Sequence, residues 1–225
     1  VVLITSDPHR ADHLGCAPHG AGVQTPTLDQ LAADGVRFTN ATSVSSITNP
    51  SHAAIFTGMH VRDTGIVGNL VPLAERARTL AEEFRAAGWR TFAAVSARHL
   101  TPWRSGFGQG FAKFDAPEKE MTRDGNETIA KARGMLADAD EHDVFLWLHL
   151  FEAHAPYEAQ EGCTELYYTG DPYSSDLPEL QEPVRPVWNK RVRDESYLRA
   201  LYKGEISYLD QNLGRFFDAV PRVRE

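Results

Sequence analysis

The chain contains little cysteine, no long apolar segment and no excess of basic residues. Its 225 residues include two cysteines, Cys16 and Cys163, which cannot form a disulfide framework and do not have a zinc-binding spacing. No run approaches the roughly 18 apolar residues of a membrane helix, so we expect no membrane segment in this chain. The formal net charge of −8 argues against a nucleic-acid-binding surface, which needs a basic face. An anionic substrate would therefore have to be held locally, by a metal ion and a few hydrogen-bond donors.

The overall composition, 42% hydrophobic and 24% charged, is ordinary for a folded globular protein. No signal peptide is visible, but residues 1–5 (VVLIT) already have the pattern of a buried strand, so any segment that precedes them lies outside this chain. The localisation of the protein therefore stays unknown at this stage.

Apolar runs and amphipathic segments alternate along the chain. Apolar runs at 1–5, 90–95 and 144–150 are typical of strands that are covered on both faces in a parallel sheet. Amphipathic helices are predicted at 79–87 and 126–139. We therefore expect an α/β fold, with a wound, mostly parallel sheet and helices on both of its faces. The other predicted elements are a helix that opens at 25 and closes at Gly35, a strand at 36–39, a helix from near Pro50 to Gly58, and a long helix over 197–220.

Residues 158–193 are rich in proline, tyrosine and acidic residues and show no clear periodicity. Such a stretch predicts a long surface excursion and not a domain boundary. We therefore expect residues 1–225 to belong to a single domain. The glycine-rich stretch 106–110 follows no clean strand-to-helix turn, which argues against a dinucleotide site.

The first candidate functional residue is Asp7, which comes directly after the apolar run 1–5. In an open α/β sheet the ligand crevice lies beyond the carboxyl ends of the strands, so a carboxylate there is a candidate metal ligand. An aspartate at such a position is also a common turn or helix cap. Position alone leaves both interpretations open.

The second candidate is Thr48, which precedes Pro50 at the predicted start of a helix. Proline suits the first helical position, so Thr48 is expected just ahead of the helix amino terminus. Free N–H groups and the helix dipole at that end favour an ionised hydroxyl and a bound phosphate or sulfate group. The alternative is a capping threonine without a chemical role.

Several segments together resemble sulfatase-family enzymes of the alkaline phosphatase superfamily. These segments are 1–15 (VVLITSDPHRADHLG), 25–32 (TPTLDQLA), 35–38 (GVRF), 48–58 (TNPSHAAIFTG), 106–115, 145–157 (FLWLHLFEAHAPY) and 202–213. Residues 48–58 fall on the family's nucleophile motif, C-x-P-S-R followed by a helix that ends in T-G. Residues 145–157 resemble the family's strand that ends in an H-x-P-Y turn. The resemblance covers nearly the whole chain and implies an alkaline phosphatase-like fold and a metal-dependent hydrolase of sulfuric or phosphoric esters.

The resemblance also gives roles to single residues. Asp7 would be a metal ligand, and Thr48 would be the nucleophile that also contacts the metal. His154 would donate to the non-bridging oxygens or the leaving group of the substrate. His52 stands where the motif has an arginine, and it would offer the substrate a group that is mostly neutral at pH 7.

A further spacing resembles nucleotide pyrophosphatase/phosphodiesterases of the same superfamily. In those enzymes a T-x-P-N-H stretch is followed by T-G and then by G-I-x-x-N, whose asparagine helps to hold the phosphoryl oxygen. Here Thr57, Gly58 and residues 65–69 (GIVGN) follow Thr48 in the same order. Asn69 is therefore a candidate oxyanion donor, or only part of a turn.

The sequence departs from the sulfatase pattern at the nucleophile. Sulfatases of the well-known type convert a cysteine or serine there into formylglycine, an aldehyde that Thr48 cannot form. A catalytic Thr48 would instead attack as a metal-bound alkoxide and leave a covalent ester for water to cleave. The implied cofactor is a divalent metal ion, with calcium, zinc, magnesium and manganese as candidates. Pro8 stands where many sulfatases have a second metal-binding aspartate, so at most one carboxylate comes from this strand.

Family members continue beyond the helix that resembles 197–220 into a strand that ends in an Asp-His or Asp-Asn pair. We therefore expect this chain to be an amino-terminal part of the catalytic domain, and to bind metal poorly and turn over no substrate by itself. Three functions stay open for the intact protein. The first is hydrolysis of small anionic esters. The second is that of a phosphodiesterase or phospho-group transferase of the same superfamily. The third is ligand binding by a catalytically inactive homologue.

Overall fold

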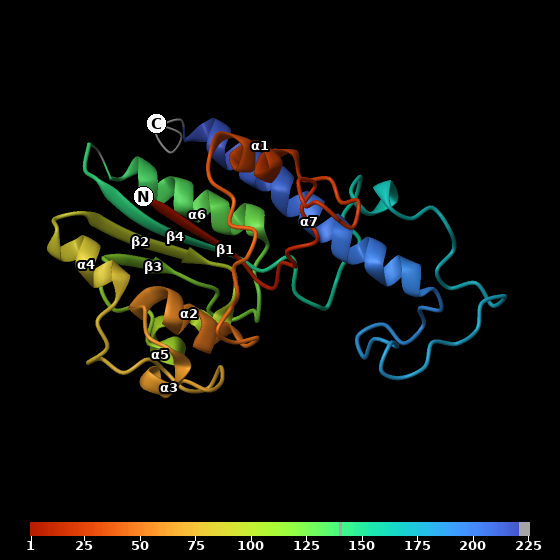
Figure 1. Ribbon diagram of the computed structural model, residues 1–225, viewed down its shortest axis with the longest axis horizontal. Coiled ribbons are helices and arrows are strands. Elements are labelled where there is room, and N and C mark those ends of the chain that lie inside the picture. The colour runs from red at the N-terminus through yellow and green to blue at the C-terminus, as the bar shows by residue number, and fades with distance from the viewer. Residues whose placement is uncertain (140, 221–225) are drawn as a thin grey trace. The chain divides into compact units, whose positions relative to one another are not determined.

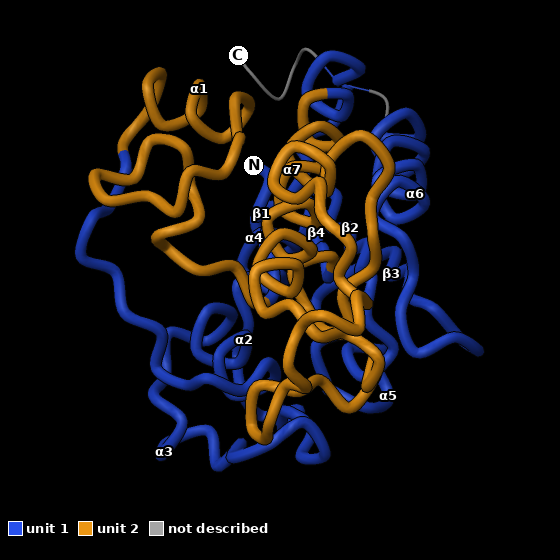
Figure 2. Tube along the Cα trace, turned by 90° about the vertical axis from the view of Figure 1, so that its right-hand side faces the viewer, with its two compact units in different colours: residues 1–7, 37–151, 215–225 blue, residues 8–36, 152–214 orange. Residues whose placement is uncertain are grey.

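The computed structural model describes residues 1–139 and 141–220, which divide into two compact units (Figure 2). The sheet unit contains the four described strands. The loop-rich unit contains most of the irregular structure. The sheet unit comprises Val1–Asp7, Arg37–Phe151 and the residues from Arg215 on, and the loop-rich unit comprises Pro8–Val36 and Glu152–Gly214.

Strands and helices alternate along the described residues, as Figure 1 shows. The strands are β1 (Val2–Ser6), β2 (Arg90–Val95), β3 (Lys113–Asp115) and β4 (Val144–Leu150). The helices are α1 (Pro26–Asp34), α2 (Thr48–Thr57), α3 (Val61–Thr64), α4 (Leu80–Ala86), α5 (Pro102–Ser105), α6 (Gly125–Ala137) and α7 (Glu195–Ala219), with 3-10 turns η1 (Arg98–Leu100) and η2 (Thr164–Leu166). Of the helices in the described part of the chain, none is long and apolar enough to cross a membrane.

The sheet has the order β1-β4-β2-β3, and every neighbouring pair is parallel. In the register of the central strand β4, His149 lies opposite Thr5 of β1 and opposite Val95 of β2. The carboxyl ends of three strands therefore meet at one edge of the sheet. This arrangement confirms the predicted wound, parallel sheet.

Helices cover both faces of the sheet within this unit (Figure 1). Successive side chains of a strand point to opposite faces. Phe145 and Trp147 of β4 pack with Phe56 of α2 and Ala81 of α4 in one apolar cluster. Helix α6 contacts β2 and β4 on the other face. All seven residues of β4 are buried, which explains why this strand is a continuous apolar run in the sequence.

Two predicted elements differ from the structure. Residues 36–39 do not form a strand, and Val36 and Phe38 are 82% and 81% exposed. A β-favouring composition cannot make a strand without a neighbouring strand to pair with. The short edge strand β3 was not predicted, because three residues are too few for a periodicity and the strand depends on pairing with β2.

The loop-rich unit is built around the part of α7 that precedes Arg215. Asp210 of α7 accepts hydrogen bonds from the first-turn N–H groups of Thr27 (3.0 Å) and Leu28 (2.8 Å), so it caps α1. Tyr202 and Ile206 of the same helix belong to the unit's apolar cluster. The stretch 158–193 contains one regular element, the 3-10 turn η2.

Candidate active site

Strand β1 and helix α2 bring Asp7 and Thr48 together in the sheet unit. Asp7 follows β1, and its N–H donates to the Leu150 carbonyl at 3.1 Å. Thr48 is the first residue of α2, and its side chain lies close enough to the Asp7 carboxylate to help lower the pKa of that carboxyl. Thr48 is 9% exposed and the Asp7 side chain 17%. A carboxylate and a hydroxyl therefore share a nearly buried position beyond the carboxyl ends of the strands.

The Asp7 carboxyl is ionised at neutral pH. Burial by itself would raise its pKa, because a desolvated carboxylate is unfavourable. The neighbouring side chains of His149 and Thr48 outweigh burial and lower the pKa of Asp7 to about 2. The carboxylate therefore carries its negative charge beside the Thr48 hydroxyl at neutral pH.

His149 lies next to the Asp7 carboxylate and was missed by the sequence analysis. It is fully buried, and its Nε2 is 3.6 Å from Asp7 Oδ2, just outside hydrogen-bonding range. The β1–β4 register explains this closeness, since His149 pairs with Thr5 two residues before Asp7. The feature of the sequence that could have identified His149 is that it is a single titratable residue near the end of an otherwise apolar strand.

His52 hydrogen bonds through both ring nitrogens within the sheet unit. Its Nδ1–H donates to the Thr48 carbonyl at 2.9 Å, since a carbonyl can only accept. Its Nε2 then accepts from the Thr5 hydroxyl at 3.2 Å, and Thr5 accepts from Trp147 Nε1–H at 3.0 Å. Burial, followed by repulsion from His149, lowers the pKa of His52 to about 4. His52 is therefore neutral at pH 7 and fixes the carbonyl of Thr48.

Asn69 holds the first turn of α2. Its Oδ1 accepts from the Asn49 N–H at 2.9 Å, and its carbonyl accepts from Asn49 Nδ2 at 3.2 Å. With Oδ1 used in this way, the Nδ2 amino group of Asn69 has no hydrogen-bond partner among the described residues. The structure thus places a free amide donor against the helix that starts at Thr48.

The first turn of α2 presents fewer N–H groups than the sequence suggested. The helix begins at Thr48 itself with Ile47 as its cap, and not near Pro50. Pro50 occupies the third position, where its missing N–H costs nothing because first-turn N–H groups lack intrahelical partners. Since the Asn49 N–H binds Asn69, the Thr48 N–H is the first-turn amide left for an anion in the described structure.

His154 belongs to the loop-rich unit, whereas Asp7, Thr48, His52 and Asn69 belong to the sheet unit (Figure 2). His154 follows β4 and its Nδ1 hydrogen bonds to the Ala155 carbonyl at 2.6 Å. The structure therefore brings four of the five sequence-predicted residues into one unit.

The sheet unit supplies part of a metal site. Asp7 and Thr48 offer the oxygen ligands that hard divalent cations prefer. Asp7 Oδ2 is buried without a hydrogen-bond partner in the described residues, as expected for an oxygen kept for a cation. However, no group of three or more His, Cys, Asp or Glu side chains in the described ranges could hold a metal ion. The ligand chemistry fits a divalent cation, whereas the number of ligands is incomplete.

Comparison with known proteins identifies the family. The sulfatase family model matches residues 1–224, so the chain belongs to the sulfatase family. It is 30% identical over 276 aligned residues to the uncharacterized sulfatase YidJ of Escherichia coli K12, covering 100% of this chain and 54% of that protein. It is 38% identical over 91 residues to an ulvan-active sulfatase of Formosa agariphila, covering 40% of this chain and 18% of that protein. The chain thus spans about half or less of these relatives.

Solved structures confirm the alkaline phosphatase-like α/β fold. The phosphonate monoester hydrolase of Agrobacterium radiobacter matches with a TM-score of 0.76 at 19% identity, over 99% of this chain and 59% of that one. The putative sulfatase yidJ of Bacteroides fragilis matches with a TM-score of 0.73 at 21% identity, over 99% of this chain and 58% of that one.

Proposed function

We propose that the protein hydrolyses anionic esters with Thr48 as the nucleophile. The observation that carries this proposal is the position of the Thr48 hydroxyl, at the first turn of α2 and beside an ionised Asp7 carboxylate. Membership of the sulfatase family supports it, as do relatives named as a sulfatase and as a phosphonate monoester hydrolase.

Asp7 orients the hydroxyl and does not take its proton. A carboxylate with a pKa of about 2 is too weak a base to hold that proton at neutral pH. Asp7 and Thr48 would instead be ligands of a divalent metal ion, together with further ligands. When bound, the ion would act as a Lewis acid that favours the ionised hydroxyl.

The reaction proceeds in two displacements. The Thr48 hydroxyl gives up its proton to water and Oγ1 forms a bond to the sulfur or phosphorus atom. The bond to the ester oxygen breaks as that oxygen takes up a proton, for which His154 is the proposed donor. Water then attacks the Thr48 ester, which restores the hydroxyl and releases the inorganic anion or phosphonate. Asn69 Nδ2 and the Thr48 N–H donate to the non-bridging oxygens.

His52 acts in this proposal as a positioning residue. Both of its ring nitrogens bind protein atoms, and one of those atoms is the Thr48 carbonyl. His52 therefore fixes the Thr48 peptide and acts on the substrate only through Thr48.

Phosphate or phosphonate esters are the proposed substrate class, because threonine cannot form the aldehyde of formylglycine-type sulfatases. The test assays the intact protein, of which this chain is expected to be a part, against matched aryl phosphate, phosphonate and sulfate esters, with mass spectrometry of residue 48. We expect phosphorus esters to react faster and a phosphorylated Thr48 to be trapped at low pH. A strong sulfate preference with unmodified Thr48 would refute the phosphoester assignment.

Substitutions at Thr48 test the nucleophile separately. Thr48→Ala should abolish turnover, whereas Thr48→Ser should keep part of it because the hydroxyl remains. Thr57→Ala is a matched control, since Thr57 ends the same helix and its hydroxyl donates to the Ala53 carbonyl. Undiminished turnover by Thr48→Ala would exclude the nucleophile role. Ligand binding by a wild-type protein without turnover would instead indicate an inactive homologue.

A further inference from the structure

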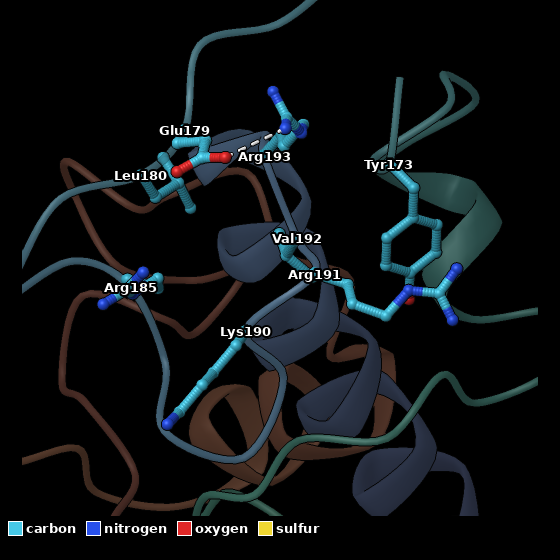
Figure 3. A pocket seen from close by; sticks show the side chains of 8 residues that line it. All are labelled: Tyr173, Glu179, Leu180, Arg185, Lys190, Arg191, Val192 and Arg193. Atoms are coloured by element: carbon cyan, nitrogen blue, oxygen red, sulfur yellow. Dashed lines mark hydrogen bonds and ion pairs between the residues drawn. The ribbon is translucent and has the colours of Figure 1, made fainter. Parts of the chain in front are cut away.

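The pocket of the loop-rich unit holds charged side chains that point to different partners (Figure 3). Its cavity volume is about 330 Å³. In Figure 3 the Arg191 side chain extends toward Tyr173 and away from Lys190, with its guanidinium carbon 5.6 Å from the Tyr173 ring centre. Arg193 forms an ion pair with Glu179 at 3.2 Å. These charges do not meet at a common binding point. A different group of side chains, in the sheet unit, does converge.

His149 occupies a core position of the sheet unit, and the proposed reaction gives it no role. It is fully buried in β4, where the other six residues are apolar. Neither of its ring nitrogens has a hydrogen-bond partner in the described structure. A buried polar group without a full partner costs free energy, so an apolar side chain would suit this position better for folding alone. The presence of a histidine here therefore favours a functional explanation.

The fold directs one nitrogen of His149 at the carboxylate of Asp7. His149 lies opposite Thr5 in the β1–β4 register, and Asp7 follows Thr5 by two residues, so these side chains point to the same face of the sheet. The Asp7 N–H donates to the Leu150 carbonyl at 3.1 Å, which continues the strand pairing as far as Asp7. His149 Nε2 lies 3.6 Å from Asp7 Oδ2. Both the backbone and the side chain of Asp7 are therefore approached from β4.

Aromatic rings pack around the imidazole of His149. The ring centre of His52 in α2 lies 5.1 Å from that of His149, Trp147 of the same strand lies 5.9 Å away, and Phe151 lies 5.8 Å away. Rings on several sides leave the imidazole little freedom to turn in a close-packed interior. Nε2 therefore stays directed at the Asp7 carboxylate, as a group that supports a functional side chain must.

The contact leaves the carboxylate available to a cation. Because a carboxylate can only accept, the nitrogen of His149 that faces Asp7 carries a proton. An ionised carboxylate has about four lone-pair sites, so one N–H leaves the others for Thr48 and a metal ion. Burial raises the pKa of Asp7, and His149 is foremost among the neighbours that lower it to about 2. His149 thus favours the ionised form that a metal ligand needs.

We propose that His149 is a positioning residue, whose Nε2–H orients the Asp7 carboxylate for a divalent metal ion beside Thr48. This inference rests on the proposed function, in which Asp7 is a metal ligand, and adds the residue that holds this ligand in place. Outer partners of metal ligands contribute roughly 10–100-fold to metal affinity or activity. His52 stands where the sulfatase motif has an arginine, but its two ring nitrogens already bind Thr48 and Thr5.

Variants of the intact protein, of which this chain is expected to be a part, test the proposal. His149→Phe keeps a ring and removes the N–H, whereas His149→Gln keeps an N–H donor near the position of Nε2. His142→Phe is the matched control, because His142 is an exposed histidine of the same unit. Each metal-depleted protein is titrated calorimetrically with calcium, zinc, magnesium and manganese chloride. Thermal unfolding without metal checks that the variants are folded.

For the ion that the wild type binds most tightly, His149→Phe should bind roughly 10–100-fold more weakly. His149→Gln and His142→Phe should keep most of the wild-type affinity. At saturating metal, kcat for an aryl phosphate ester should fall in His149→Phe while KM changes little, because His149 faces Asp7 and not the substrate.

Three results of the titrations would overturn the proposal. The first is equal metal affinity of His149→Phe and His142→Phe. The second is absence of metal binding to the wild type. The third is an equal loss in His149→Gln and His149→Phe, which would indicate that the imidazole itself binds the metal.

NMR of isotope-labelled histidine side chains in the wild type tests the proposal without a substitution at residue 149. We expect a protonated Nε2 in His149 both before and after metal is added. A His149 Nε2 without a proton would overturn the proposal.

The proposed function can fail separately from the role of His149. A wild type that shows the expected metal titrations but no ester turnover would refute the function of Thr48 and leave the role of His149 intact. Ester turnover by the wild type, with unaltered metal affinity in His149→Phe, would refute only the role of His149.

Discussion

The Thr48 side chain lies beside the Asp7 carboxylate and helps to lower the pKa of that carboxyl, although the two residues lie far apart in the sequence. The contact forms because β1 ends, and α2 begins, at the same edge of the sheet. His149 completes the arrangement from the neighbouring strand, with Nε2 3.6 Å from Asp7 Oδ2.

Asp7→Asn removes the negative charge and keeps the shape of the side chain. We expect weaker binding of divalent metal and a loss of kcat/KM of at least ~100-fold, because even residues that only support metal ligands contribute 10–100-fold. Metal titration calorimetry and ester turnover measure the two effects. Asp138→Asn, which removes an exposed carboxylate paired with Lys113, should change neither. Unchanged metal affinity in Asp7→Asn would exclude Asp7 as a ligand.

His52→Phe keeps a ring in the buried position and removes both hydrogen bonds. The Thr48 carbonyl and the Thr5 hydroxyl would each lose a partner, so we expect a decrease of about 1–3 kcal/mol in the free energy of unfolding. Because His52 positions the nucleophile, kcat should fall while KM changes little. A large rise in KM with unchanged kcat would instead indicate that His52 binds the substrate directly.

Asn69→Asp distinguishes the role of the Asn69 side-chain oxygen, an acceptor, from that of its amino group, a donor. The new carboxylate can still accept from the Asn49 N–H, so the stability of the first turn of α2 should be retained. The amino donor is lost and a negative charge is introduced, so kcat/KM should fall by roughly 10²–10³-fold. Asn40→Asp, at an exposed position of the same unit, controls for the added charge. Full activity of Asn69→Asp would remove Asn69 from the oxyanion site.

Glu205 makes the stability of the loop-rich unit depend on pH. It is buried, and burial raises its pKa to about 7 although the Glu158 N–H and Gln160 Nε2 donate to it. A carboxyl with a raised folded-state pKa favours folding when protonated. Its stabilising contribution is therefore complete below the unfolded value of 4.5 and is lost as the pH rises towards 7.

Glu205→Gln should remove this dependence. The Gln160 amide can rotate to pair with the new amide, so both hydrogen bonds remain possible. We expect the variant to gain about 1–3 kcal/mol over the wild type at pH 8 and almost nothing at pH 4.5. Thermal unfolding across this range measures the difference, with the exposed Glu161→Gln as control. A constant difference at all pH values would contradict the assignment.

The sequence predicted the main elements of the sheet and the class of fold. The ranges 90–95 and 144–150 match β2 and β4 to the residue, because strands buried on both faces require continuous apolar runs. Thr79, at the predicted start of a helix, does cap α4 through a reciprocal hydrogen bond with Glu82. The ordered motifs also predicted the sulfatase family, which the family match confirms.

The sequence did not predict features that depend on pairing between distant segments. Residues 36–39 have a strand-like composition but no partner strand, whereas β3 forms in only three residues because β2 lies beside it. The sequence pattern places His149 in an apolar strand and gives it no functional role, since local periodicity does not show which neighbour a strand will have. Its position opposite Thr5 makes it a neighbour of Asp7.

By itself, the sequence determined the main strands and the longer helices, the family, and the chemical character of Thr48, which cannot form the aldehyde of formylglycine. Only the tertiary structure decided that Thr48 shares its position with an ionised Asp7, and that His52 is neutral and bound on both sides. The physical reason is that composition and periodicity act along the chain. Charge, burial and hydrogen bonding of a site arise from side chains that only folding brings together.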